Sequence, residues 1–408
     1  MNTLISHTLR AKPTLIATAI ASLFFSYGTA QASDKAPVKN GASQIHITMT
    51  NDNNGSCLVD YHSAKAGPVT FNVVNKTATS LTELELLSEN RILGEKENLA
   101  PGLPAVKFTV TLDGGAYQIY CPGAANEMIP FTVTGKSRKN TSTTTAALLD
   151  EGVKGYANYV HGVVDSMVVA VERLKMDIDA GDLAQAKENY AKARPFYERI
   201  ESDVSGFVLP GFSVTDNSGN LDYLVDMRAS NLDPNVGWHG FHALERDLFQ
   251  KGVITPSTQQ LAAELYDNII KLDEIAKTLT LQPEDLANGA ASLLEEVQSN
   301  KISGEEEAFS HLDLLDFNGN VEGAEQAFAF LKPGMDKIDP DITRQVTEQF
   351  AVVRALLDTY RDPSIPGGFK YYTAELKASD AAKLSRSVQA LQEPLSKIAE
   401  KVATSGSF

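Results

Sequence analysis

The chain has 408 residues, of which 43% are hydrophobic, as in ordinary soluble globular proteins. This length exceeds what one hydrophobic core usually serves, so we expect at least two domains. The 36 basic and 52 acidic side chains give a formal net charge of -16, which repels phosphate backbones and favours cationic ligands. Nucleic acid is therefore excluded as an expected partner.

The first 32 residues have the pattern of a secretory signal peptide. Arg10 and Lys12 precede the apolar run TLIATAIASLFF, and Ala30-Gln31-Ala32 fits a signal-peptidase site. No later segment of the sequence approaches the ~18 consecutive apolar residues that a membrane-spanning helix needs. We expect residues 1–32 to be removed and the mature protein to be exported and soluble, without a membrane anchor.

Residues 33–135 are predicted to form a β domain. Runs such as QIHITMT, VTFNVVN and VKFTVTL alternate with a period near two, and Gly, Pro and Asn turns separate them. Six or seven short strands in about ninety residues predict a β-sandwich or a small barrel. The polar stretch 136–145 is expected to be a linker.

Residues 146–408 are predicted to form an all-α bundle, because apolar residues recur every three or four positions. The candidate helices span roughly 146–180, 182–203, 237–250, 256–279, 284–300, 303–332, 339–361 and 379–402. Asp182 and Ser303 are expected to cap two of them. Between the second and third lies a long connection, 204–236, and loops of that length are usually functional or disordered.

The segment GWHGFHALERDLF, residues 237–249, places polar groups in an otherwise apolar helix. His242 and Glu245 are three residues apart, so a helix can direct a ring nitrogen and a carboxylate at one point. Metal-binding bundles use such pairs on facing helices. A hydrogen-bonded or solvated pair is the alternative, because HxxE occurs often by chance.

Further carboxylates lie near this helix in the sequence. YERIE contributes Glu198 and Glu201, and LDYLVDMR contributes Asp222 and Asp226. Charged groups near a core need partners, and one cation would neutralise several carboxylates at once. A mixed nitrogen and oxygen set suits iron, zinc or manganese better than calcium or magnesium.

Several segments together resemble the EfeO-type periplasmic iron-uptake proteins. These are YAKARPFYERIES, LDYLVDMR, GFHALERDLF, KISGEEEAFSHLDLLDFNGNVEG and, in the β domain, GEKENLAPG, in the same order over nearly the whole mature chain. The resemblance implies a multidomain protein, with a cupredoxin-like all-β sandwich over 33–135 and an imelysin-like helical metal-binding domain over 146–408. The implied helical metal site comprises Glu198, Asp226, His242 and Glu245.

Two other groups have no such assignment. His239 has no counterpart in the family pattern and is expected at a helix entry, with a role around the metal ligands as the alternative. An acidic block follows Ser303, and its carboxylates suit the first turn of a helix, with metal ligation as the alternative. The block consists of Glu305, Glu306, His311, Asp313 and Asp316.

The chain contains two cysteines, Cys57 and Cys121. A blue-copper centre needs two histidines, a cysteine and a weak axial ligand, but no histidine lies between Cys121 and Met128. An electron-transfer copper site is therefore not expected. A disulfide and a second metal site for zinc or copper, formed by both cysteines with Glu83 and Glu85, stay open as alternatives.

The resemblance implies a binding protein rather than an enzyme. Such a protein captures ferrous or ferric iron in the periplasm and delivers it to an inner-membrane iron permease, with a periplasmic haem peroxidase as a further partner. One alternative is an imelysin-type metallopeptidase, although the HExxH motif of many zinc peptidases is absent from the sequence. The other alternative is metal-bridged binding of an anionic ligand, for which the sequence shows no clustered basic or aromatic stripe.

Overall fold

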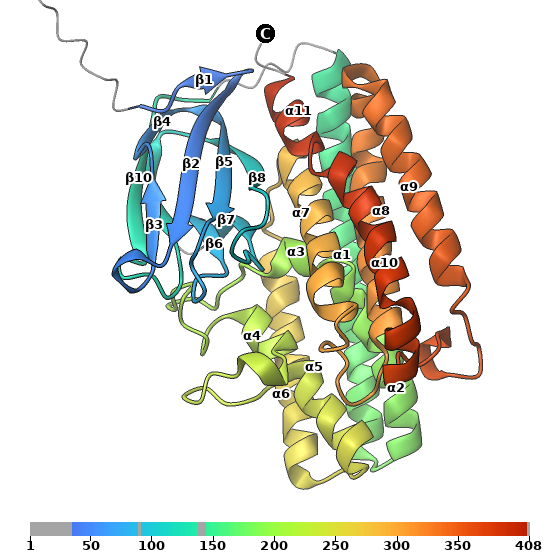
Figure 1. Ribbon diagram of the computed structural model, residues 1–408. Coiled ribbons are helices and arrows are strands. Elements are labelled where there is room, and N and C mark those ends of the chain that lie inside the picture. Colours follow the sequence, from blue (N-terminus) through green and yellow to red (C-terminus); the bar gives the residue numbers. More distant parts are fainter. Residues whose placement is uncertain (1–34, 89–90, 138–143, 406–408) are drawn as a thin grey trace, which may run out of the picture. The chain divides into compact units, whose positions relative to one another are not determined.

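The computed structural model describes residues 35–88, 91–137 and 144–405. The predicted signal peptide, 1–32, lies outside the described residues, as do positions 138–143 of the predicted linker. A β-rich region precedes a helical region, as the change of period predicts (Figure 1). In the part of the chain that is described, no helix combines the length and apolar character needed to cross a membrane.

Alternating apolar residues build the strands of the β-rich region. In β2 (Ala42–Thr50), the side chains of Ile45 and Ile47 are buried and that of His46 between them is exposed. The other described strands are β1 (Val38–Lys39), β3 (Ser56–Val59), β4 (Ser63–Lys65), β5 (Gly67–Asn75), β6 (Leu84–Ser88), β7 (Arg91–Lys96), β8 (Val106–Leu112), β9 (Gly115–Tyr120) and β10 (Met128–Thr134). The pattern thus predicts the strands but undercounts them, because several are very short.

These strands form two five-stranded sheets that share one core. The first has the order β1-β2-β5-β8, with β3 paired to β2, and the second has the order β4-β10-β9-β6-β7. Strand β2 is parallel to β5, and β4 is parallel to β10. Between the sheets, Phe71 stacks on Phe108 with ring centroids 5.0 Å apart and meets Phe131 of the other sheet edge-on at 5.5 Å. Of the two predicted alternatives, a β-sandwich and a small barrel, this arrangement is the sandwich.

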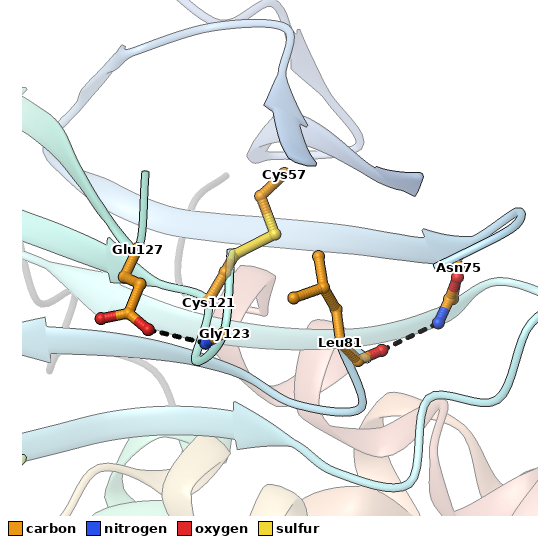
Figure 2. Close-up of a disulfide and its surroundings, with 6 residues drawn as sticks. All are labelled: Cys57, Asn75, Leu81, Cys121, Gly123 and Glu127. Carbon is orange, nitrogen blue, oxygen red and sulfur yellow. Dashed lines mark hydrogen bonds between the residues drawn. A yellow bond between two sulfur atoms is a disulfide. The ribbon is translucent and has the colours of Figure 1, made fainter. Parts of the chain in front are cut away.

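A disulfide joins Cys57 of β3 to Cys121, the residue after β9 (Figure 2). The loop that follows Cys121 is held by Glu127, whose Oε1 accepts a hydrogen bond from the backbone N–H of Gly123 at 2.7 Å. Of the two alternatives for the cysteines, the structure therefore forms the disulfide. Neither sulfur is a free thiolate that could bind zinc or copper.

The double variant Cys57→Ala/Cys121→Ala is expected to lose about 4 kcal/mol of unfolding free energy, because the bridge closes a loop of 64 residues. Denaturant unfolding without reductant, followed by the signal of the β-rich region, measures this loss. Reductant added to the wild type should reproduce it. Equal midpoints for the wild type and the double variant would contradict a disulfide in the native protein.

The helical region contains long helices, among which α1, α8 and α9 lie side by side (Figure 1). The described α-helices are α1 (Thr144–Asp179), α2 (Leu183–Glu198), α3 (Glu201–Val204), α4 (Leu221–Asp226), α5 (Gly240–Glu245), α6 (Pro256–Ala276), α7 (Pro283–Glu296), α8 (Asp313–Ile338), α9 (Pro340–Asp358), α10 (Ala374–Leu395) and α11 (Ile398–Thr404). π-Helical turns follow two of them, η3 (Arg246–Lys251) after α5 and η4 (Val297–Lys301) after α7.

One predicted helix cap is present and another is wrong. Asp182 caps α2 by accepting a hydrogen bond from the backbone N–H of Gln185 at 3.0 Å. Ser303 caps no helix, because residues 302–312 are turns and irregular backbone and α8 begins at Asp313. The φ of Gly304 is 72°, a left-handed conformation that interrupts a right-handed helix. Glu305 and Glu306 are therefore not in the first turn of a helix, whereas Asp313 and Asp316 of the same block do lie in the first turn of α8.

The predicted long connection, 204–236, contains a helix of its own. Asn220 caps α4, and its side chain accepts hydrogen bonds from the backbone N–H groups of Asp222 and Tyr223. The start of α5 packs against the end of α4 through Gly240, whose φ is 79°. A Cβ atom at Gly240 would lie 2.1 Å from the carbonyl oxygen of Val225. Glycine therefore lets α5 begin directly against the helix that carries Asp226.

Candidate metal centre

The four residues of the predicted helical site lie together in the core of the helical region. Glu198 ends α2, Asp226 ends α4, and His242 and Glu245 both lie on α5. Their exposed fractions are 0%, 7%, 1% and 0%, respectively. Four ionisable side chains at this burial need strong electrostatic compensation from their neighbours.

The turn segment 302–312 and the start of α8 add further carboxylates. Glu306 and Glu307 are 1% and 0% exposed, and Asp316 is 0% exposed. A Cβ atom at Gly319 would lie 2.7 Å from the Cβ of Glu198, so a glycine on α8 allows this close approach to α2. Helix packing thus places Asp316 beside Glu198.

Within the described residues, three sets of side chains bring ligand atoms within 4.8 Å of one another. The sets are Asp226, His242 and Glu306; His242, Glu245 and Glu307; and Glu198, Glu306 and Asp316. Because the sets share His242 and Glu306, they form one connected centre. We refer to these seven residues as the acidic centre.

His242 lies between carboxylates on both sides of its ring. Its Nδ1 is 3.1 Å from Oε2 of Glu245, and its Nε2 is 3.3 Å from Oε1 of Glu306 and 3.5 Å from Oδ1 of Asp226. Burial lowers the pKa of His242, but the hydrogen bonds to Glu245 and Glu306 outweigh burial and raise the pKa to about 10. Without a metal the ring therefore carries a proton on each nitrogen, and a metal would replace one of them.

Glu245 has a second contact that the sequence does not reveal. Its Oε1 accepts hydrogen bonds from the backbone N–H groups of Phe309 and Ser310, each at 2.7 Å. Burial and the nearby Glu307 raise the pKa of Glu245 to about 7. The carboxylate therefore fixes the turn segment 302–312 against α5 as well as facing His242.

Two buried basic residues also belong to the centre, and neither was predicted from the sequence. Arg194 and Lys301 are 0% and 1% exposed. Nitrogens of the Arg194 guanidinium contact oxygens of Glu198, Asp226, Glu306, Glu307 and Asp316. Nζ of Lys301 lies 3.2 Å from Oε2 of Glu198 and 3.3 Å from Oε2 of Glu306. These cations compensate part of the negative charge of the acidic centre.

Several carboxylate oxygens of the centre still accept no hydrogen bond from a protein group. They are Oε1 and Oε2 of Glu198, Oδ1 of Asp226, and Oδ1 and Oδ2 of Asp316. Nitrogens of Arg194 or Lys301 lie at ion-pair distance from four of these five oxygens, without hydrogen-bond geometry. Buried oxygens of this kind are unfavourable unless they are protonated or coordinated. The donor set therefore fits a multivalent cation with hard oxygen and imidazole ligands.

Charge in the centre is unevenly distributed. Burial raises the pKa of Asp226 to about 7, although Arg194 and His242 lower it. Burial also raises the pKa of Asp316 well above its ordinary value. Burial acts in the same direction on Glu306, but Lys301, Arg228 and His242 together hold its pKa well below the usual range. Glu306 is therefore the permanent anion of the centre, while its neighbours can carry protons.

The remaining polar candidates take other positions. Glu305 and His311 are exposed, and Oδ1 of Asp313 accepts a hydrogen bond from the backbone N–H of Glu307 at 3.2 Å. His239 is the N-cap residue of α5, with its Nδ1 3.0 Å from Oε2 of Glu264, so it lies at a helix entry as expected. Glu307 was not predicted, and the signal in the sequence is a third consecutive glutamate next to an apolar residue.

Comparison with known proteins identifies the family of the chain. The family model for imelysin, also described as peptidase M75, matches residues 152–398. The chain belongs to the imelysin family.

Full-length relatives extend the similarity into the β-rich region. The chain is 31% identical over 400 residues to the iron uptake system component EfeO of Escherichia coli strain K12 and to that of Shigella flexneri. In both comparisons, 97% of this chain and 97% of the relative are covered. The identity to EfeO of Escherichia coli O6:H1 strain CFT073 is 30% over the same length. This imelysin-family chain is therefore an EfeO-type protein, as the resemblance in its motifs predicts.

The second predicted site of the EfeO-type chain is divided in the structure. Its cysteines form the disulfide, whereas Glu83 and Glu85 line a separate cavity of about 130 Å³. Other carboxylates of the lining come from β7 and its end and from the helical region: Glu95, Glu97, Glu201, Asp222, Glu295 and Glu296. We call this cavity the acidic pocket. Glu95 and Glu97 were not predicted, although their spacing of two residues in GEKEN is a signal for one face of a strand.

The acidic pocket holds excess negative charge that burial makes unfavourable. Burial, the hydrogen bond with Glu85 and the negative charge of Glu85 raise the pKa of Glu83 to about 9. Burial and the charges of Glu83 and Asp222 raise the pKa of Glu95 to about 8. Like-charge carboxylates in a buried cavity either take up protons or bind a cation. In this chain, the pocket therefore offers carboxylate oxygens, without sulfur, as candidate ligands.

Proposed function

We propose that this protein binds iron at the acidic centre and delivers it to an inner-membrane iron permease. The observation that supports this most directly is the set of buried carboxylate oxygens in the acidic centre that accept no hydrogen bond from a protein group. Hard oxygen and imidazole ligands accept both ferrous and ferric ions. The relatives named as iron uptake components and the acidic composition point in the same direction.

Residues 1–32 have the pattern of a signal peptide, and we propose that the mature protein acts in the periplasm. The partners proposed from the family resemblance are the permease and a periplasmic haem peroxidase of the same uptake system. A carrier that passes between such partners has to release its ion, so moderate affinity suits it better than the tightest binding.

The arrangement favours a binding protein over a peptidase, the alternative that the family description keeps open. A hydrolytic metal site needs an open coordination position that a peptide can reach. All seven residues of the acidic centre are at most 7% exposed, and Arg194 and Lys301 lie among them. A peptide-cleavage screen with and without chelator tests the alternative. If the protein cleaves peptides, and both the chelator and the Glu306→Gln substitution abolish the cleavage, the proposal of a binding protein would give way to that of a metallopeptidase.

The binding proposal is tested by titrating the metal-free mature protein with ferrous ion under anaerobic conditions and with chelated ferric ion, zinc and copper. His242→Ala is expected to lower iron affinity at least ~10-fold, because it removes a ring nitrogen from two of the three ligand sets. Isothermal calorimetry measures the affinity.

His239→Ala is the matched control, because His239 lies three residues away on the same segment and outside the ligand sets. Its affinity should equal that of the wild type. Equal affinities of wild type and His242→Ala, with both proteins folded, would contradict binding at the acidic centre. The acidic pocket would then be the principal site.

We further propose that Glu83 and Glu85 serve a second cation site in the acidic pocket, together with Glu95 and Glu97. A set made only of carboxylates suits hard ions such as iron better than copper or zinc. The excess of buried carboxylates over cations in the lining supports this assignment. A second calorimetric phase that survives His242→Ala and disappears in Glu83→Gln/Glu95→Gln is the expected result.

A further inference from the structure

Arg194 occupies the middle of the acidic centre. Its Nη1 lies 2.5 Å from Oδ1 of Asp226, and its Nη2 lies 2.8 Å from Oε1 of Glu306. Its Nε lies 3.3 Å from Oε1 of Glu307 and 3.3 Å from Oδ2 of Asp316. One guanidinium thus faces carboxylates that come from three separate parts of the chain: α4, the turn segment 302–312 and α8.

Every ligand set includes at least one carboxylate that Arg194 contacts. In the first set these are Asp226 and Glu306, in the second set it is Glu307, and in the third set all three members contact Arg194. A metal ion in any set would therefore lie next to the guanidinium and share its carboxylates. Two cations at such separation repel strongly in a buried environment.

We propose that Arg194 is an internal cation that competes with iron: it neutralises the carboxylates of the metal-free centre and leaves them as iron binds. This inference rests on the proposed iron-binding function. It deepens that function by assigning a residue that sets the affinity and favours release of the ion. The returning guanidinium replaces the departing metal, so the empty centre is not left with uncompensated buried charge.

The contacts of Arg194 suit a cation that can be exchanged. Its Nη1 makes no hydrogen bond of good geometry although it lies at ion-pair distance from Asp226, so charge rather than directed bonding holds this side of the group. The centre of the guanidinium lies 5.4 Å from the ring centroid of Phe241 and 6.0 Å from that of Tyr197. These ring faces attract the guanidinium without a directed hydrogen bond.

The test compares Arg194→Gln with wild type. Glutamine keeps a polar side chain and removes the positive charge. Metal-free proteins are titrated anaerobically with ferrous ion against a colorimetric chelator, and their thermal midpoints are recorded with and without the ion. Arg194→Gln is expected to bind ferrous ion at least ~10-fold more tightly, because the competing cation is gone. Its metal-free midpoint should fall, and the rise on adding iron should exceed that of wild type.

Arg199→Gln is the control. Arg199 follows α2 directly, and its Nη2 pairs with Oε2 of Glu322 at 2.7 Å, with the Arg199 side chain 26% exposed. The iron affinity of Arg199→Gln should equal that of wild type.

Arg194→Lys retains the charge on a group that reaches fewer carboxylates, so the iron affinity of this variant should lie between those of wild type and Arg194→Gln. This lysine variant decides the question if the glutamine variant does not fold.

Wild-type binding together with equal or weaker binding by the Arg194 variants would overturn the inference and make Arg194 a residue that positions the ligands. Binding by neither wild type nor the folded variants would overturn the proposed function itself, and the competition with it. Binding by Arg194→Gln alone would support competition while contradicting iron capture by the natural protein.

Discussion

Lowering the pH from 8 to 6 is expected to weaken iron binding to the acidic centre at least ~100-fold. The pKa of His242 is raised to about 10 in the metal-free protein, so its ring must lose a proton before it can bind a metal. Below that pKa, each unit of pH decrease lowers the affinity about tenfold for each proton released. Asp226 and Glu245, with pKa values of about 7, add to the loss because both gain protons between pH 8 and pH 6.

The loss of iron affinity at lower pH follows from the direction in which each pKa is shifted. A group whose pKa is raised in the metal-free protein holds a proton that competes with the metal, and acid favours the protonated form. Titrations with ferrous ion at several pH values, in buffers that do not bind iron, give the slope of affinity against pH. His242→Ala should show a slope smaller by about one proton. An affinity that is constant from pH 6 to pH 8 would contradict a protonated His242 in the empty centre.

Glu306→Gln is expected to lower the unfolding free energy of the metal-free protein by about 3–5 kcal/mol. Oε2 of Glu306 lies 2.9 Å from Nη1 of Arg228 and 3.3 Å from Nζ of Lys301, and its Oε1 lies 2.8 Å from Nη2 of Arg194. Removing this anion leaves the buried Arg194 and Lys301 and the partly buried Arg228 without their common anionic partner. Iron binding should weaken as well, because Glu306 belongs to two ligand sets.

Asp316→Asn is the matched variant. Burial raises the pKa of Asp316 well above its ordinary value, although Arg194 lowers it, so this carboxyl takes up a proton more readily than an ordinary aspartate and an amide resembles its protonated form closely. We expect its metal-free stability to change by less than about 1 kcal/mol, while its iron affinity falls. Denaturant unfolding of both metal-free variants separates the two effects. A loss of stability for Asp316→Asn as large as that for Glu306→Gln would show that Asp316 is charged in the empty centre.

The sequence predicts the order of the two regions because their periods differ. In QIHITMT, apolar residues recur every second position because successive side chains of β2 point to opposite faces of the sheet. After position 144, apolar residues recur every three or four positions because one face of each helix is buried. The HxxE spacing correctly places His242 and Glu245 on one helix, and the resemblance brings Glu198 and Asp226 beside them. The role of these four residues as metal ligands stays a prediction.

Other parts of the centre depend on contacts between distant segments. Ser303 and the acids after it have the local chemistry of a helix cap, but the left-handed φ of Gly304 and the hydrogen bonds to Glu245 impose a turn instead. Local pattern cannot show that Arg194 and Lys301 are buried, because an isolated helix would place such residues in solvent. Hydrogen bonds between distant segments stabilise the turn, and ion pairs between distant segments stabilise the burial of Arg194 and Lys301.

The acidic pocket and the disulfide also depend on contacts between distant segments, which local sequence patterns do not predict. Two cysteines 64 positions apart are equally compatible with a bridge and with metal ligation until their backbones are positioned. The structure places their Cα atoms 6.6 Å apart, within the range that a disulfide spans. Glu83 and Glu85 belong to a cavity whose other carboxylates come partly from the helices, and no strand pattern could indicate those neighbours.

The acidic centre gathers its side chains from α2, α4, α5, the turn segment 302–312 and α8. No short stretch of the polypeptide contains all of these side chains, so the complete set of candidate ligands exists only in the folded chain. An ion bound by the complete set would therefore indicate that the chain has folded. A ligand held only by the native state also opposes global unfolding. A bound ion would thus protect the folded chain from proteases.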